Sequence, residues 1–160
     1  MILKDSVYIE ETGQSFCTVE YKKKTYTGTA NLHPEDKEAG LGSKYTGCRY
    51  AEMRAEIKAL KTEYKIAKAA CEECRKFVKA CTQYKNFDKN SPTAKAMFRQ
   101  LNKRIKQVNK LADKINKKIA DLNTAIKQKE IVHNALERKR GRGLRTSVTI
   151  VDEAIDMNNN

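Results

Sequence analysis

Cationic side chains gather near the carboxyl end of the chain in a pattern that could bind phosphate. In the run Arg138-Lys139-Arg140-Gly141-Arg142-Gly143-Leu144-Arg145, five of eight residues are cationic and two are glycine. Arginine can hold a phosphate with two parallel hydrogen bonds, and glycine lets backbone amides approach a ligand closely. The run follows a predicted helix, whose carboxyl end carries the negative end of the helix dipole, so the side chains must supply the charge. A basic helix end followed by a flexible hinge is the alternative interpretation.

Two further basic features lie on the preceding predicted helix. Phe98 could stack on a base while Arg99 pairs with a phosphate, although packing at the tip of a helical hairpin would also explain Phe98. Lysines and arginines then recur along the helix at Lys103, Arg104, Lys106, Lys110, Lys114, Lys117 and Lys118. This run is either a solvated face or a track for the phosphates of a nucleic acid.

Cys71 and Cys74 have the spacing of half a zinc site or of a redox pair, with Cys81 and His133 as further candidate ligands. All three cysteines also fall on the apolar seam of a predicted helix, where a free cysteine packs as a small apolar residue. We therefore expect core packing, five reduced thiols, no metal and no cofactor.

No set of catalytic residues stands out in the sequence. His33, followed by Glu35 and Asp36, is typical of the start of a helical turn, where acidic side chains interact favourably with the helix dipole. Neither a glycine-rich phosphate loop nor a nucleophile motif is visible. We therefore expect a binding protein and not an enzyme.

A small sheet and two long helices must position these residues. Residues 2–31 alternate in the manner of a three-stranded antiparallel meander, with Cys17, Val19 and Tyr21 on one face. Gly40, Gly42 and Gly47 are expected to break the segment that follows. A strand at 146–152 is predicted to complete a sheet, in the same chain or in a second copy. The fold class is thus α+β, in a single domain over residues 1–160.

Apolar residues at alternating steps of three and four predict helices over 49–86 and 92–140. Ser91 and Pro92 provide an amino-terminal cap and a first helical residue. The two helices should fold back as an antiparallel hairpin of the coiled-coil type, with apolar positions left over for association with another copy. The first seam comprises Met53, Ile57, Leu60, Tyr64, Ala67, Cys71, Cys74, Val78 and Cys81.

Composition sets the class of partner. The 160 residues are 33% charged, have a mean hydropathy of −0.76 and carry a formal charge of +13. The excess is uneven: residues 1–46 carry six basic and seven acidic side chains, whereas residues 92–160 carry sixteen and seven. Such a charge favours anionic partners, whether small molecules or nucleic acid. No run of 18 apolar residues and no secretory signal is visible, so we expect a protein of a reducing cytoplasm with no membrane partner.

Several short motifs together resemble small proteins of tailed phages that infect Gram-positive bacteria. They are His33-Pro34-Glu35-Asp36-Lys37, the stretch from Ala51 to Lys61, Met97-Phe98-Arg99-Gln100, and Arg138-Lys139-Arg140-Gly141. The layout of sheet, helix pair and strand is similar to the Thoeris anti-defence family of phage sponges. That resemblance implies a homodimer or higher homo-oligomer in the cytoplasm of a bacterial host, which sequesters a cyclic ADP-ribose isomer or a cyclic oligonucleotide without degrading it.

The resemblance also implies a ligand set. Arg138, Lys139, Arg140, Arg142 and Arg145 would hold phosphates, and Arg54 would contribute to a second set in oligomer pockets. The alternative function is a basic inhibitor that binds nucleic acid or a nucleoprotein, such as an anti-CRISPR protein. A structural coiled coil of the virion is a third possibility.

Overall fold

The computed structural model describes residues 1–33 and 43–139, apart from the side chains of Glu130 and of residues 132–139. The chain divides into two compact units, Met1–Thr124 and Ala125–Asn160. The first unit contains a sheet and a helical hairpin, as predicted, so the fold is α+β. The predicted strand at 146–152 lies outside the described residues.

The sheet is an antiparallel meander of three strands, β1 (Ile2–Ile9), β2 (Gln14–Tyr21) and β3 (Lys24–Asn31), with β2 in the centre. The predicted alternation in β2 is confirmed, because Cys17 and Val19 are buried against a helix whereas their neighbours are half-exposed. A two-residue turn joins β2 to β3, and Lys22 and Lys23 both have positive φ. This mirror-image turn matches the twist of the strands it joins.

Two long helices follow the sheet, α2 (Lys44–Thr82) and α3 (Pro92–Lys139). Helix α2 begins five residues before the predicted start and ends four residues before the predicted end. It starts at Lys44 because the side chain of Ser43 caps it by accepting a hydrogen bond from the Thr46 amide. The predicted cap of α3 is confirmed, since Ser91 Oγ accepts a hydrogen bond from the Ala94 amide at 3.2 Å.

The expectation that Gly47 breaks the helix was wrong, and packing gives the reason. A β carbon on Gly47 would lie 2.2 Å from Ser15 Oγ, so only glycine lets this turn of α2 approach β2 so closely. The same close approach recurs at Gly28 of β3, which lies against the backbone of Ala51 and Ala55. One face of α2 is therefore built of small residues that let the sheet lie directly on the helix.

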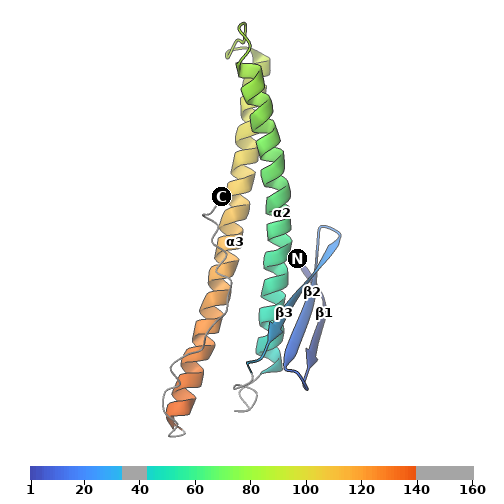
Figure 1. Ribbon diagram of the computed structural model, residues 1–160, viewed down its shortest axis with the longest axis vertical. Coiled ribbons are helices and arrows are strands. Elements are labelled where there is room, and N and C mark those ends of the chain that lie inside the picture. Colours follow the sequence, from blue (N-terminus) through green and yellow to red (C-terminus); the bar gives the residue numbers. More distant parts are fainter. Residues whose placement is uncertain (34–42, 140–160) are drawn as a thin grey trace. The chain divides into compact units, whose positions relative to one another are not determined.

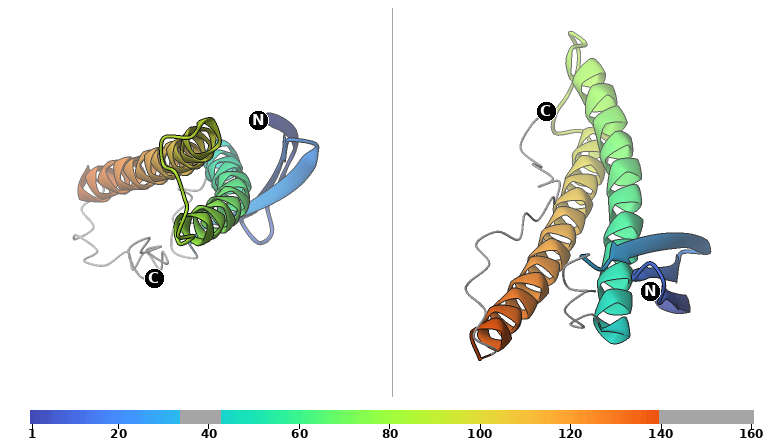
Figure 2. Two further views of the ribbon diagram at one scale, coloured as in Figure 1. Left: turned by 90° about the horizontal axis from the view of Figure 1, so that it is seen from above. Right: turned by 60° about the horizontal axis from the view of Figure 1, so that its bottom comes forward.

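The other buried face of α2 is the predicted seam. Met53, Ile57 and Leu60 are buried, and Cys71 and Val78 continue the seam towards the tip of the hairpin. Leu60 forms a core cluster with Leu111 and Ile115 of α3, which shows that the two helices pack against each other. Figures 1 and 2 show the sheet on one side of α2 and the first part of α3 on another. Helix α2 is thus the central element of the first unit.

In the second unit, the described residues continue α3, and the side chain of Ile131 is 67% exposed. All five cysteines are free, and each of them is buried or half-buried. Among the described residues, none of the helices combines the length and the apolar character that a membrane span requires.

Candidate ligand site

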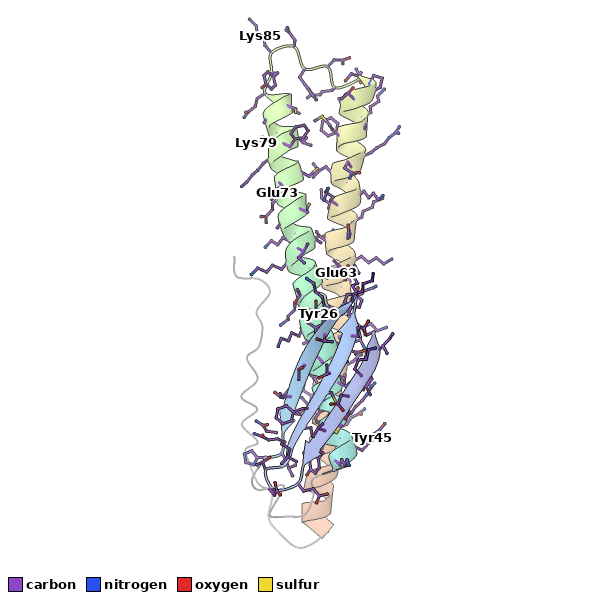
Figure 3. The ribbon with its side chains drawn as sticks, turned by 90° about the vertical axis from the view of Figure 1, so that its right-hand side faces the viewer. Tyr26, Tyr45, Glu63, Glu73, Lys79 and Lys85 are labelled. Atoms are coloured by element: carbon purple, nitrogen blue, oxygen red, sulfur yellow. The ribbon has the colours of Figure 1, made fainter. Side chains whose placement is uncertain are left out.

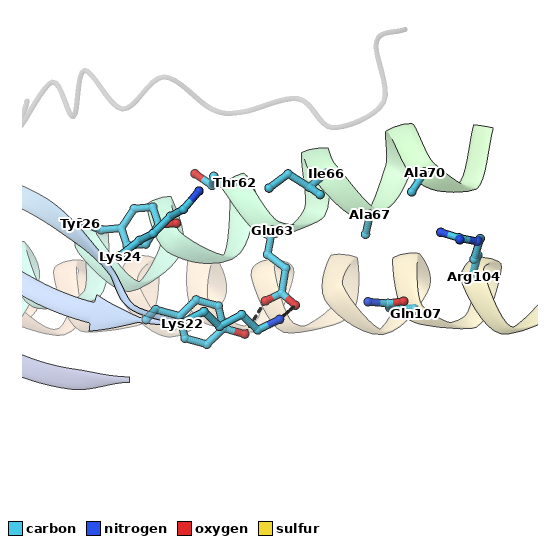
Figure 4. Close-up of a pocket in the computed structure, with 11 residues that line it drawn as sticks. Lys22, Lys24, Tyr26, Thr62, Glu63, Ile66, Ala67, Ala70, Arg104 and Gln107 are labelled. Atoms are coloured by element: carbon cyan, nitrogen blue, oxygen red, sulfur yellow. Dashed lines mark hydrogen bonds and ion pairs between the residues drawn. The ribbon is translucent and has the colours of Figure 1, made fainter. Parts of the chain in front are cut away.

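A cavity of about 420 Å³ opens where the β2–β3 turn meets the two helices (Figure 4). The sheet contributes the residues around the turn, α2 contributes one face of its middle section, and α3 contributes two polar side chains. Figure 3 shows Tyr26 of β3 and Glu63 of α2 near the same end of the sheet. The cavity is lined by Tyr21, Lys22, Lys24, Tyr26, Thr62, Glu63, Ile66, Ala67, Ala70, Arg104 and Gln107.

Glu63 holds the turn onto α2. Its carboxylate accepts hydrogen bonds from the Tyr21 hydroxyl and from Lys22 Nζ, and the ammonium group of Lys22 also lies 5.5 Å from the centre of the Tyr21 ring. Burial of Glu63 opposes its ionisation, but the hydrogen bonds from Lys22 and Tyr21 outweigh this effect, so its pKa is lowered. The hydrogen bond to Glu63 raises the pKa of both Tyr21 and Lys22. At neutral pH the group therefore carries a carboxylate, an ammonium and a neutral phenol.

Cations outnumber this single carboxylate in the cavity wall. Lys22, Lys24 and Arg104 line the cavity, and Glu63 is the one acidic side chain among the lining residues. Arg104 Nε is buried and has no hydrogen-bond partner among the described residues. A buried donor without an acceptor costs free energy, about 1–3 kcal/mol. The cavity thus has a positive wall, to which Arg104 contributes a guanidinium whose Nε lacks a partner among the described residues.

The turn that carries two of these cations adopts an unusual backbone. Lys22 and Lys23 have φ values of 50° and 62°, in the left-handed region that glycine or asparagine usually occupies. Such a conformation costs roughly 1–3 kcal/mol for a residue with a side chain, and it concentrates at functional sites. Here it places Lys22 and Lys24 at the cavity.

Aromatic and apolar groups complete the wall. Tyr21 and Tyr26 are half-buried, and Ile66, Ala67 and Ala70 form an apolar strip along α2 (Figure 4). Phenol rings can stack on a flat ring system while the neighbouring cations bind negative charge. The arrangement can therefore hold an anion that carries a planar group.

The residues predicted from sequence lie elsewhere. Arg54 Nη1 donates a hydrogen bond to the carbonyl oxygen of Thr29 at 2.9 Å, so Arg54 joins α2 to β3. Phe98 packs edge-to-face on Phe87, with ring centres 6.5 Å apart, at the loop between the helices. Packing at the hairpin tip is thus the interpretation of Phe98 that its contacts favour. The structure does not bring Arg54 and Phe98 together.

The remaining predicted residues belong to α3 or follow it. Arg99 is exposed near the start of α3. Arg138 and Lys139 are the last residues of α3, and their side chains are not described. Arg140, Arg142 and Arg145 lie outside the described residues.

The sequence contained a signal for Arg104. It lies seven residues before Leu111 and eleven before Ile115, and both of those residues are buried against α2. These spacings place Arg104 on the inward face of α3, unlike the exposed lysines around it. The prediction grouped Arg104 with the lysines of the basic run, so it missed this difference between a half-buried cation and the solvated ones.

Metal ligands do not gather in the described part of the chain, where no three histidine, cysteine or acidic side chains lie together.

In comparisons with known proteins, no family model, no curated protein and no solved structure was found to match this chain.

Proposed function

We propose that this protein binds and sequesters a small anionic molecule of the cyclic nucleotide class and does not transform it. The observation that carries the proposal is the composition of the cavity wall, which combines two tyrosine rings beside Lys22 and Lys24 with the cation Arg104 at the other end (Figure 4). Phosphates would bind the cations, and a base would lie on the phenol rings. A volume of about 420 Å³ falls within the usual range for small-molecule sites.

The setting of the proposal comes from the sequence. The short motifs resemble small proteins of tailed phages, and the predicted layout is similar to the anti-defence sponges, which supports a cyclic ADP-ribose isomer or a cyclic oligonucleotide as the ligand. The cytoplasm of a bacterial host would then be the compartment, and sequestration would lower the concentration of an immune signal. A homo-oligomer would place several such cavities in one particle.

Ligand capture tests the proposal directly. The purified protein is incubated with a panel of cyclic ADP-ribose isomers and cyclic di- and trinucleotides, and unbound compounds are removed by filtration. The protein is then denatured, and released compounds are identified by mass spectrometry. Recovery of one intact compound is the expected result. Recovery of a cleaved product would contradict binding without transformation, and recovery of none would overturn the proposal.

A matched pair of variants locates the site. Arg104→Gln removes one of the three cations that line the cavity, whereas Arg99→Gln removes an exposed cation from the same helix. Loss of a charge-assisted hydrogen bond costs about 1.5–3 kcal/mol, so Arg104→Gln should weaken binding by roughly 10- to 100-fold. Arg99→Gln should leave the affinity within about twofold. Equal affinities for the two variants, measured by titration calorimetry, would exclude this cavity as the site.

A further inference from the structure

One face of α3 carries a continuous line of exposed cations, which we name the basic face. Their spacings of four, four, three, four, four and three residues keep them on one side of the helix. At a rise of 1.5 Å per residue, the line is about 33 Å long. Its members are Lys95, Arg99, Lys103, Lys106, Lys110, Lys114 and Lys117, and all seven are exposed.

The basic face is separate from the residues that hold the hairpin together. Leu111, Ile115 and Leu122, which are buried, lie on the opposite side of α3. Lys118 lies off the basic face and pairs with Glu56 of α2 at 2.5 Å. No ion pair joins the seven cations to any described residue, and Asp113 is the single acidic residue between Lys95 and Lys117. Lys114 lies near enough to Glu63 of α2 to interact with it electrostatically, whereas the charge of the other six cations is not neutralised by an ion pair within the described part of the chain.

The chemistry of the face indicates its partner. With a rise of about 1.5 Å per residue, spacings of three and four residues place a cation roughly every 4.5–6 Å along the helix axis. Such a regular line of positive charge complements a polymer with regularly spaced negative charges. Duplex DNA carries about one negative charge per 1.7 Å, and binding to it releases condensed counterions. Proteins that bind single strands stack the bases on aromatic side chains. Phe98 lies next to Arg99, but its ring is packed on Phe87, so the basic face offers no such ring.

Shape favours duplex DNA over duplex RNA. An α-helix with its side chains is about 10–12 Å across, close to the width of the major groove of B-form DNA, about 12 Å. The major groove of A-form RNA is deep and narrow, so it does not admit a helix of this width. We propose that the basic face of α3 binds the phosphate backbone of double-stranded DNA without sequence preference, independently of the cavity.

Charge reversal on two helices tests this proposal. The variant Lys103→Glu/Lys106→Glu/Lys110→Glu changes the basic face, and Lys68→Glu/Lys76→Glu/Lys79→Glu changes three exposed lysines of α2. Each variant lowers the net charge by six, so a loss specific to the basic face cannot come from overall charge. Binding is measured by fluorescence anisotropy with a labelled 30-base-pair DNA of arbitrary sequence, and circular dichroism confirms that both variants remain helical.

For the unmodified protein, we expect the logarithm of the affinity to fall with the logarithm of salt concentration with a slope of roughly −4 to −6, as for about five or six neutralised phosphates. The basic-face variant should lose at least about tenfold in affinity at 50 mM salt, and the α2 variant less than about threefold. Arg104→Gln should bind DNA normally, which separates this surface from the cavity. Absence of DNA binding by the unmodified protein, or equal losses in the two charge-reversal variants, would overturn the proposal.

Discussion

Gly28 lies so close to Ala51 that a β carbon at Gly28 would stand 2.1 Å from the Ala51 carbonyl oxygen. The same β carbon would lie 2.4 Å from the Ala55 amide nitrogen. Both contacts are with backbone atoms of α2, which cannot move aside as a flexible side chain can. The distance between β3 and α2 is therefore set by the absence of a side chain at one position.

Gly28→Ala should destabilise the protein by roughly 1–3 kcal/mol, since the strand must move away from α2 to accommodate the methyl group. Urea unfolding followed by circular dichroism at 222 nm measures the change in the free energy of unfolding. Thr27→Ala is the control on the same strand, because Thr27 is exposed, and it should cost about 1 kcal/mol or less. Equal losses in the two variants would contradict the close packing at Gly28.

Ser15 and Gly47 form a second close contact, at which we expect one substitution to stabilise the protein. Ser15 Oγ is buried without a hydrogen-bond partner among the described residues, so Ser15→Ala should raise the free energy of unfolding by about 0.5–2 kcal/mol. Gly47→Ala alone should destabilise, because its β carbon would meet this oxygen at 2.2 Å. In the Ser15→Ala background the same change should cost less, since the oxygen is gone and alanine favours the helix. A double-mutant cycle measures this coupling, and purely additive effects would refute it.

The carboxylate of Glu63 should make stability depend on pH. Its pKa is lowered on folding, so its contribution is present above the ordinary value of 4.5 and is lost as the pH falls through the folded pKa. Glu63→Gln should lose about 1 kcal/mol at pH 7 and show a flatter profile below pH 5. At the alkaline end, the raised pKa values of Tyr21 and Lys22 contribute to the free energy of unfolding, and this contribution is lost above about pH 10. Glu63→Gln lacks the carboxylate that raises these pKa values, so it should not show this loss. Urea unfolding between pH 3 and pH 11 measures both limbs, and parallel profiles would contradict the pKa directions.

Phe98→Ala should separate packing from ligand contact. Removing the half-buried ring from its edge-to-face partner Phe87 should cost roughly 1–3 kcal/mol of stability. Phe77→Ala is the matched control, because Phe77 is 60% exposed and should change stability little. Ligand capture by Phe98→Ala should equal that of the unmodified protein. A loss of capture with unchanged stability would favour the stacking role that the sequence also allowed.

The regular patterns of the sequence predicted the elements of the first unit. Alternation identified the face of β2 that carries Cys17 and Val19, and the steps of three and four identified the seam of α2 from Met53 to Val78. Both signals are local, because each depends on hydropathy within one element. The second buried face of α2 gave no such signal, since Ala51, Ala55 and Ala59 are weakly apolar and their burial depends on a glycine in β3.

The cavity was harder to predict, because it depends on residues that meet only after folding. Tyr21 and Glu63 are 42 positions apart, and nothing near either residue indicates that they form a hydrogen bond. Arg104 stands within a run of lysines, and its partial burial depends on how α3 packs against α2. The predicted arginine cluster begins with the last two residues of α3, and Arg140, Arg142 and Arg145 lie outside the described residues.

The elements that pack against α2 change along its length. Between Glu56 and Glu63 it contacts both the sheet and the first part of α3, whereas nearer the hairpin tip α3 alone packs against it (Figure 1). Local opening needs fewer contacts to break where an element has a single neighbour. The tip can therefore fray and re-form while the sheet-bearing end stays closed, so the molecule combines a firm base with a helical arm of lower local stability.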